Sequence, residues 1–189
     1  MVKQGMLSDQ ESYQDVITFW FEEIDKAKWF AKDTSFDQLL RDKFAELHGK
    51  AVACELSGWR DNALGSLAEV IILDQFSRNI FRDEPQAFLY DPLSLALAQV
   101  AIAKGFDKAL TVEQTSFLYM PFMHSESLVI HNQAVKLFTE LGAPNNLEFE
   151  LKHKAIIEQF GRYPHRNEIL GRYSTPQELE YLAQPGAGF

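Results

Sequence analysis

Apolar residues recur along most of the chain three and four positions apart, the spacing that gathers them on one face of an α-helix. The first stripe covers residues 16–24, and Ser8 or Asp9 can cap the start of its helix. A second stripe covers residues 36–51, and Thr34 or Ser35 can open its helix. Strand-like alternation is scarce, so the pattern predicts an all-α protein.

The third stripe, within residues 61–82, differs from the others because its middle is apolar nearly all round. Val70 and Leu73 add apolar side chains between the positions of the stripe itself. A helix that is apolar around its whole circumference is typically buried on every side. We therefore expect this helix to be central in the fold.

Capping signals set the limits of the next two helices. Asp91 is followed by proline, which predicts a helix that is capped there and ends before Gly105. Thr111 and Gln114 fit a capping box for the following helix. Pro121 should end or kink that helix, because proline lacks the N–H that a helix interior requires.

Glycines mark the ends of two further helices. Ser125 can open a helix that stops at Gly142. Asn145 or Asn146 can open the next one, which stops at Gly161.

The last helix starts at Thr175-Pro176-x-Glu178, which combines a cap, a first-position proline and a third-position glutamate. Connections along the chain are roughly two to eight residues long, which is typical of antiparallel helix neighbours. The sequence thus predicts an array of about seven to nine antiparallel helices, built as a single domain over residues 1–189. We find no 34-residue repeat with the tetratricopeptide signature spacing.

Composition narrows the class of protein. With 46% hydrophobic residues among 189, the chain can bury a sizeable core without a disulfide or a structural metal. Its one cysteine, Cys54, excludes an internal disulfide and lies in a helical pattern that favours a core position. No apolar run approaches the roughly 20 residues of a membrane span, and the N-terminus lacks a signal-peptide pattern. We expect a soluble cytoplasmic protein with no membrane partner and no cofactor.

Charge is unevenly distributed. The formal net charge of -9 argues against a nucleic-acid partner. Between residues 152 and 172, however, the chain has five Lys and Arg against two Glu, a local charge of 5 - 2 = +3. One basic corner on an acidic protein can attract a small anion. The alternative is a solvated helix face with ordinary ion pairs.

The first of three polar segments interrupts the central helix. Asp74 and Arg78 are four positions apart and share a helix face, which Arg82 extends. Charges on a buried helix need partners. They can form a buried network that fixes helix register, or they can line one end of a functional cleft. In the second case Asp74 and Arg78 are ligand-binding residues.

The second polar segment covers residues 119–126, at the helix junction expected beside Pro121. His124 and Glu126 would not face each other on a regular helix, but a junction can bring them together. Both are candidates for proton transfer, and a hydrogen-bonded structural pair is the alternative. Their spacing matches neither the His-Glu-x-x-His motif nor the zinc-deaminase signature, so we expect no metal.

The third polar segment covers residues 153–172 and contains two short helix starts. Free N–H groups at helix starts and the planar fork of arginine both suit a carboxylate or a phosphate. Alternatively, these arginines satisfy helix C-terminal carbonyls and nearby acidic side chains. His165 is a third candidate for proton transfer. The candidate ligand-binding residues of this segment are Arg162, Arg166, Asn167 and Arg172.

These same segments resemble a known family. The resemblance rests on residues 74–82 (DQFSRNIFR), 119–126 (YMPFMHSE), 160–167 (FGRYPHRN), 170–175 (LGRYST) and 16–21 (VITFWF). Together they are similar to the bacterial family called domain of unknown function 924, over nearly the whole chain. The resemblance implies an all-helical, tetratricopeptide-like α-α superhelix. It implies no established activity, cofactor or catalytic residue.

Two hypotheses of function follow. In the first, the helices gather the three polar segments into one pocket that binds an anionic small molecule, with or without catalysis. In the second, the array is an interaction module that holds a protein or peptide partner in a groove without catalysis. This hypothesis rests on analogy of fold. A purely structural role for the polar clusters is a third reading. The residues by themselves specify no reaction.

Overall fold

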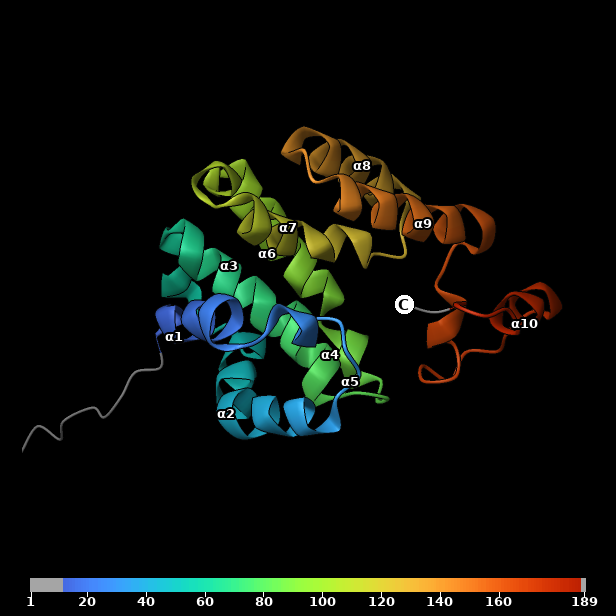
Figure 1. Cartoon of the computed structure of the whole chain (residues 1–189), viewed down its shortest axis with the longest axis horizontal. Helices are drawn as coiled ribbons and strands as arrows, with labels where there is room; N and C mark the ends of the chain where they lie inside the picture. Colours follow the sequence, from blue (N-terminus) through green and yellow to red (C-terminus); the bar gives the residue numbers. More distant parts are fainter. Residues whose placement is uncertain (1–11, 188–189) are drawn as a thin grey trace, which may run out of the picture.

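The computed structural model describes residues 12–187, and within this range the chain forms helices and no β-strand (Figure 1). The prediction of an all-α protein is therefore confirmed for the described residues. Their ten α-helical segments are α1 Tyr13–Thr18, α2 Thr34–Val52, α3 Ala63–Ile71, α4 Ser77–Ile80, α5 Gln86–Leu89, α6 Asp91–Ala103, α7 Val112–Met123, α8 Leu128–Leu141, α9 Pro144–Phe160 and α10 Pro176–Leu182. Two π turns, η1 Phe19–Glu23 and η4 Ile72–Phe76, and four 3₁₀ turns, η2 Lys26–Lys28, η3 Ser57–Asp61, η5 Phe106–Ala109 and η6 Pro164–Arg166, complete the description.

The central element runs from α3 through η4 into α4 without a break. Every residue from 65 to 77 is buried, because α1, α2, α6 and α7 pack around this stretch. The expectation of a central, buried third helix is confirmed. Trp20 stands at the middle of the surrounding core, with its ring 5.4 Å from that of Phe76 and 5.8 Å from that of Phe117 between centroids.

The C-terminal half continues as three neighbouring helices, α7, α8 and α9, which pack side by side (Figure 1). Gly142 and Gly161 end α8 and α9 in the left-handed conformation, with φ of 69° at each, as their positions predicted. At the end of α9, Ile156 and Ile157 form a small second core with Tyr163, against which Phe160 and Tyr181 pack. This second core holds η6 and α10 close to the end of α9.

Several helix starts differ from the predicted ones. Ser8 and Asp9 lie outside the described residues, and α1 is capped by a reciprocal Ser12 and Asp15 box. Helix α2 is capped by the side chain of Asp33, one residue before the predicted Thr34. Thr111–Gln114 and Thr175–Glu178 form the two capping boxes that the sequence predicted.

The junctions around the predicted polar segments also need correction. Helix α7 passes through Pro121 and continues to Met123, so the proline does not end the helix. The cap residue of α8 is Ser127 rather than Ser125. Helix α9 starts at Pro144 itself, ahead of the two asparagines, because proline fits a first helical position where no N–H is needed.

The position of Cys54 is decided by tertiary structure. The prediction of a core position for Cys54 is wrong, because the residue is exposed beyond the end of α2, in a left-handed conformation with φ of 59°. A positive φ turns the chain away from the helix and carries the side chain with it. Over residues 12–187, no helix combines the length and apolarity required to cross a bilayer.

Candidate functional site

The site begins in the π turn η4, which interrupts the regular central helix at the first polar segment. All five residues of η4 are buried, Asp74 among them with no exposed surface. One π turn shifts the helix phase and is often found where a helix carries function. Arg78 remains one turn along on the same face, with its Nη1 atom 3.2 Å from the Asp74 carboxylate and 2.8 Å from the Asp74 carbonyl oxygen.

Asp91, at the start of α6, joins the central helix to the C-terminal segment. Its carboxylate accepts two hydrogen bonds from Arg78, at 2.9 and 3.1 Å, and a third from Arg166, at 3.1 Å. The prediction that Asp91 caps α6 is therefore wrong: Tyr90 occupies the cap position without a side-chain bond. Two guanidinium groups engage this carboxylate, and each pairs its negative charge with a full positive charge.

Arg166 is held flat between two aromatic rings. Its guanidinium carbon lies 4.5 Å from the centre of Phe88 and 4.7 Å from that of Tyr163. Besides its bond to Asp91, it donates to the carbonyl oxygen of His124 at 3.1 Å, while its buried Nε–H has no partner within the described residues. Burial lowers the pKa of Arg166, and Asp91 counteracts this shift.

His124 completes the polar cluster from the C-terminal end of α7. Its Nδ1 atom lies 2.8 Å from the Asp74 carboxylate. Burial would raise the pKa of Asp74, but Arg78 and His124 hold it well below its ordinary value. Burial and then Arg78 lower the pKa of His124, which Asp74 partly offsets. An ionised Asp74 beside a neutral His124 places the imidazole proton on Nδ1, so Nε2 carries a lone pair.

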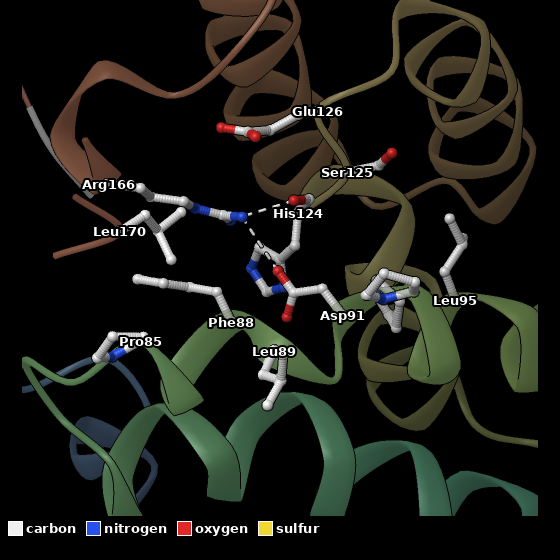
Figure 2. A pocket seen from close by; sticks show the side chains of 12 residues that line it. Pro85, Phe88, Leu89, Asp91, Leu95, His124, Ser125, Glu126, Arg166 and Leu170 are labelled. Atoms are coloured by element: carbon white, nitrogen blue, oxygen red, sulfur yellow. Dashed lines mark hydrogen bonds and ion pairs between the residues drawn. The ribbon is translucent and has the colours of Figure 1, made fainter. Parts of the chain in front are cut away.

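A cavity of about 430 Å³ opens beside this cluster (Figure 2). Its polar end contains Asp91, His124 and Arg166, together with the neighbouring Ser125 and Glu126. The rest of the lining is apolar and comes from α5, α6, α7 and the segment after η6, namely Pro85, Phe88, Leu89, Pro92, Leu95, Pro121 and Leu170. The cavity thus has one charged end and an apolar body.

Glu126 lines the same cavity but is engaged in a separate ion pair. It accepts two bonds from Arg172, at 2.7 and 2.9 Å, and one from the backbone N–H of Tyr163 at 2.7 Å. Arg172 also donates to the side-chain oxygen of Asn167 at 2.9 Å. The junction does bring His124 and Glu126 to one cavity, and Glu126 ties the loop after α7 to the loop after α9.

Arg162 and His165 lie away from this cavity. Arg162 pairs with Glu178 through bonds of 2.6 and 2.8 Å and lines a second, smaller hollow at the start of α10. His165 stands beside the ring of Tyr163, 5.5 Å between centroids, and burial lowers its pKa to about 4. Of the sequence candidates, His124, Glu126 and Arg166 line the cavity directly. Asp74 binds His124 and Arg172 binds Glu126, whereas Arg78 pairs with Asp74 and Asp91.

The basic segment carries less free charge than its sequence indicates. Each of its five cations pairs with a carboxylate: Lys152 with Glu148, Lys154 with Glu158, Arg162 with Glu178, Arg166 with Asp91 and Arg172 with Glu126. Four of these carboxylates come from outside residues 152–172, so the local charge of +3 is offset by partners that a count over this segment does not include. Within residues 12–187, no group of acidic, histidine and cysteine side chains is placed to hold a metal.

Comparison with known proteins places the chain in a family. Residues 16–186 match the family described as bacterial protein of unknown function (DUF924). The chain belongs to the DUF924 family. A solved structure, that of ATU0120 from Agrobacterium tumefaciens, a protein of unknown function, is 39% identical in sequence with a TM-score of 0.87. The similarity covers 92% of this chain and 97% of that one. A search of curated proteins gave no match.

Sequence reasoning missed two members of the cluster in this DUF924 protein. The sequence predicts only a helix cap at Asp91, because an acidic residue beside a proline gives no local sign of a distant arginine partner. Phe88 was not singled out, because one aromatic residue among fifteen phenylalanines carries no signal of stacking on a cation. Both contacts join residues more than 70 positions apart, 91 to 166 and 88 to 166.

Proposed function

We propose that this protein binds a small amphipathic carboxylate in the cavity beside Arg166. The observation that carries the proposal is the division of the cavity into an apolar body and one charged end. A ligand with a hydrocarbon part and one carboxylate matches both regions. Such a pocket, apolar with a few placed polar groups, is the usual form of a small-molecule site.

Arg166 is the residue best placed to receive the carboxylate. A guanidinium has five N–H groups, and Arg166 uses two of them in hydrogen bonds to the protein. Stacking between Phe88 and Tyr163 fixes the plane of the group before a ligand arrives, which reduces the entropy lost on binding.

The charge of the cluster favours a singly charged ligand over a phosphate. Three acidic side chains oppose three arginines in the ion pairs of the cluster: Asp74, Asp91 and Glu126 against Arg78, Arg166 and Arg172. A doubly charged phosphate would meet no excess of positive charge and would face Asp91 and Glu126. A monocarboxylate needs only unused N–H donors and is less strongly repelled.

Binding of a graded series of linear monocarboxylates, from acetate to octanoate, tests this proposal by calorimetry. Each added methylene that enters the apolar body contributes up to about 0.8 kcal/mol, so Kd should fall about fourfold per carbon until the cavity is full. Alcohols of equal length should bind more weakly because they lack the carboxylate. Equal affinity for octanol and octanoate would contradict the role of Arg166.

A pair of leucine variants locates the binding site. Leu170 is half-buried and lines the cavity, so Leu170→Trp should fill part of it and weaken octanoate binding at least tenfold (Figure 2). Leu182, also half-buried, lies at the end of α10 outside the cavity lining, and Leu182→Trp should leave binding unchanged. Equal losses in both variants would show that the carboxylate binds elsewhere.

We also propose that α6 to α9 form a tetratricopeptide-like superhelical array. Each of these helices packs against the next, and the segments between α7, α8 and α9 are only a few residues long. Short connections favour antiparallel neighbours, which supports this arrangement.

A further inference from the structure

The imidazole of His124 reaches the cavity with one nitrogen fixed and the other available. Nδ1 is engaged by Asp74 at 2.8 Å, and within residues 12–187 no group forms a hydrogen bond with Nε2. The side chain keeps 16% of its surface exposed, and Nε2 does not belong to the buried polar atoms that lack a partner. Nε2 is therefore in contact with solvent at the charged end of the cavity.

We propose that His124 is a general base that activates water for hydrolysis of carboxylic esters, with Asp74 as its positioning residue. This inference rests on the proposed function, because the acid product of the reaction is the carboxylate that Arg166 would hold. The acyl chain of the ester would occupy the apolar body of the cavity.

Asp74 fulfils the requirements of a positioning residue. It is fully buried, and Gln75 and Arg78 hold its carboxylate at 2.5 and 3.2 Å, so the acceptor for Nδ1–H is fixed in place. A fixed acceptor sets both the tautomer and the orientation of an imidazole. The proton on Nδ1 leaves Nε2 as the basic atom on the cavity side.

The charged groups around His124 come from three further elements. Arg78 approaches from α4, Asp91 from α6, and Arg166 from η6, where it binds the His124 carbonyl oxygen. Burial and Arg78 lower the pKa of His124, whereas Asp74 and Asp91 oppose the shift. The imidazole is consequently neutral and able to accept a proton at pH 7.

The reaction balances without a cofactor. Nε2 takes one proton from water while the water oxygen bonds to the ester carbonyl carbon, and the negative charge that develops on the carbonyl oxygen is stabilised by an unused N–H of Arg166. The carbon–oxygen bond to the alcohol then breaks, and the proton held on Nε2 passes to the leaving oxygen. The products are one carboxylic acid and one alcohol, and neither oxidant nor reductant is needed.

Water is the nucleophile that the cavity favours. Ser125 lines the cavity next to His124, but no hydrogen bond joins its hydroxyl to that imidazole in the described structure. A serine nucleophile needs the base within hydrogen-bond reach. His124 can take a proton from solvent directly, because Nε2 is open to it.

Hydrolysis of p-nitrophenyl esters with acyl chains from acetate to octanoate tests the inference. His124→Asn keeps a donor for Asp74 and removes the base, so kcat/KM should fall at least about 100-fold, while octanoate affinity changes less than about twofold. His48, a buried histidine that binds Ser77 at 2.8 Å and does not line the cavity, provides the control: His48→Asn should retain wild-type kcat/KM.

The pH profile separates positioning from simple structural support. For the wild type, kcat/KM should fall on the acid side with an inflection below pH 6.5, the ordinary histidine value. Asp74→Asn removes a charge that raises the pKa of His124, so the inflection should move to still lower pH, and kcat should fall more than KM changes. An unmoved inflection would reject Asp74 as a positioning residue.

The outcomes distinguish this inference from the proposed function. Octanoate binding without ester turnover above the His124→Asn level overturns the hydrolase inference and leaves carboxylate binding intact. If the wild-type protein does not bind octanoate, both the proposed function and the hydrolase inference are overturned. If His124→Asn fails to fold, Leu170→Trp serves instead, since filling the cavity should lower kcat/KM for the octanoyl ester at least tenfold. Unchanged turnover in that variant also overturns the inference.

Discussion

Single residues in this protein have roles that their neighbours in sequence do not reveal. Asp91 is the clearest case, because one carboxylate, 9% exposed as a residue, accepts hydrogen bonds from both Arg78 and Arg166. A buried cation that loses its partner keeps its desolvation cost without the compensating attraction. The stability of the whole cluster therefore depends on this one side chain.

Asp91→Asn should reduce the free energy of unfolding by about 3–5 kcal/mol, because it removes the carboxylate that pairs with the buried Arg166 and one of the two that pair with Arg78. Urea denaturation monitored by circular dichroism measures this loss. Glu148→Gln removes an exposed carboxylate paired with Lys152 one helical turn away and should leave the denaturation midpoint nearly unchanged. Similar midpoints for the two variants would show that Asp91 does not neutralise the cluster.

Where each helix begins and ends depends partly on local sequence signals and partly on packing. The Thr111 and Thr175 boxes and the glycine ends of α8 and α9 act within one helical turn, so they could be predicted from sequence. Pro121 could not, because α7 continues past it to Met123. Residues Thr115 to Met123 are all buried, and this packing holds the helix together despite a missing backbone bond.

The helix α3 should be sensitive to a single methyl group at Gly65. A Cβ there would lie 2.2 Å from the carbonyl oxygen of Trp59, and backbone cannot move aside as a side chain can. Gly65→Ala should therefore destabilise the protein by about 1–3 kcal/mol.

Gly49, inside α2, is the matched control for Gly65. A Cβ at Gly49 would meet nothing within 4 Å. Alanine is the better helix former, so Gly49→Ala should stabilise by about 0.5–1 kcal/mol. Thermal and urea unfolding of both variants measures the sign of each change in stability. A stabilising Gly65→Ala would contradict the close approach of η3 to α3.

At the scale of the whole molecule, histidines are buried in regions far apart. Burial lowers the pKa of His48 and of His165 to about 4, and that of His153 to about 3. These histidines stay neutral in the folded protein at pH values where the unfolded chain, with an ordinary value of 6.5, binds protons. The unfolded state therefore gains protons first as the pH falls.

The free energy of unfolding should consequently decrease as the pH falls below 6.5, down to the lowered pKa values near 4 and 3. Each such histidine adds a slope of up to about 1.4 kcal/mol per pH unit. Glu150 has a raised pKa and opposes this trend, because it binds its proton earlier in the folded state. Urea titrations at pH 7, 6 and 5 measure the slope.

His48→Gln should reduce the pH dependence of the free energy of unfolding by the contribution of one histidine. The amide side chain does not titrate, so the proton uptake of residue 48 on unfolding disappears. A wild-type stability that stays flat between pH 6.5 and 5 would contradict the neutral, buried state of these histidines.

The sequence by itself determined the all-α class, the central buried helix, most helix ends and the i, i+4 pairing of Asp74 with Arg78. These features depend on residues within a turn or two of one another, where periodicity and capping chemistry act directly. Only tertiary structure decided that Asp91 joins Arg78 to Arg166, that Phe88 and Tyr163 enclose Arg166, and that the arginines of the basic segment pair with distant acids. Those contacts depend on how separate helices pack against each other. The local sequence pattern does not determine which distant residue pairs with a given charged side chain.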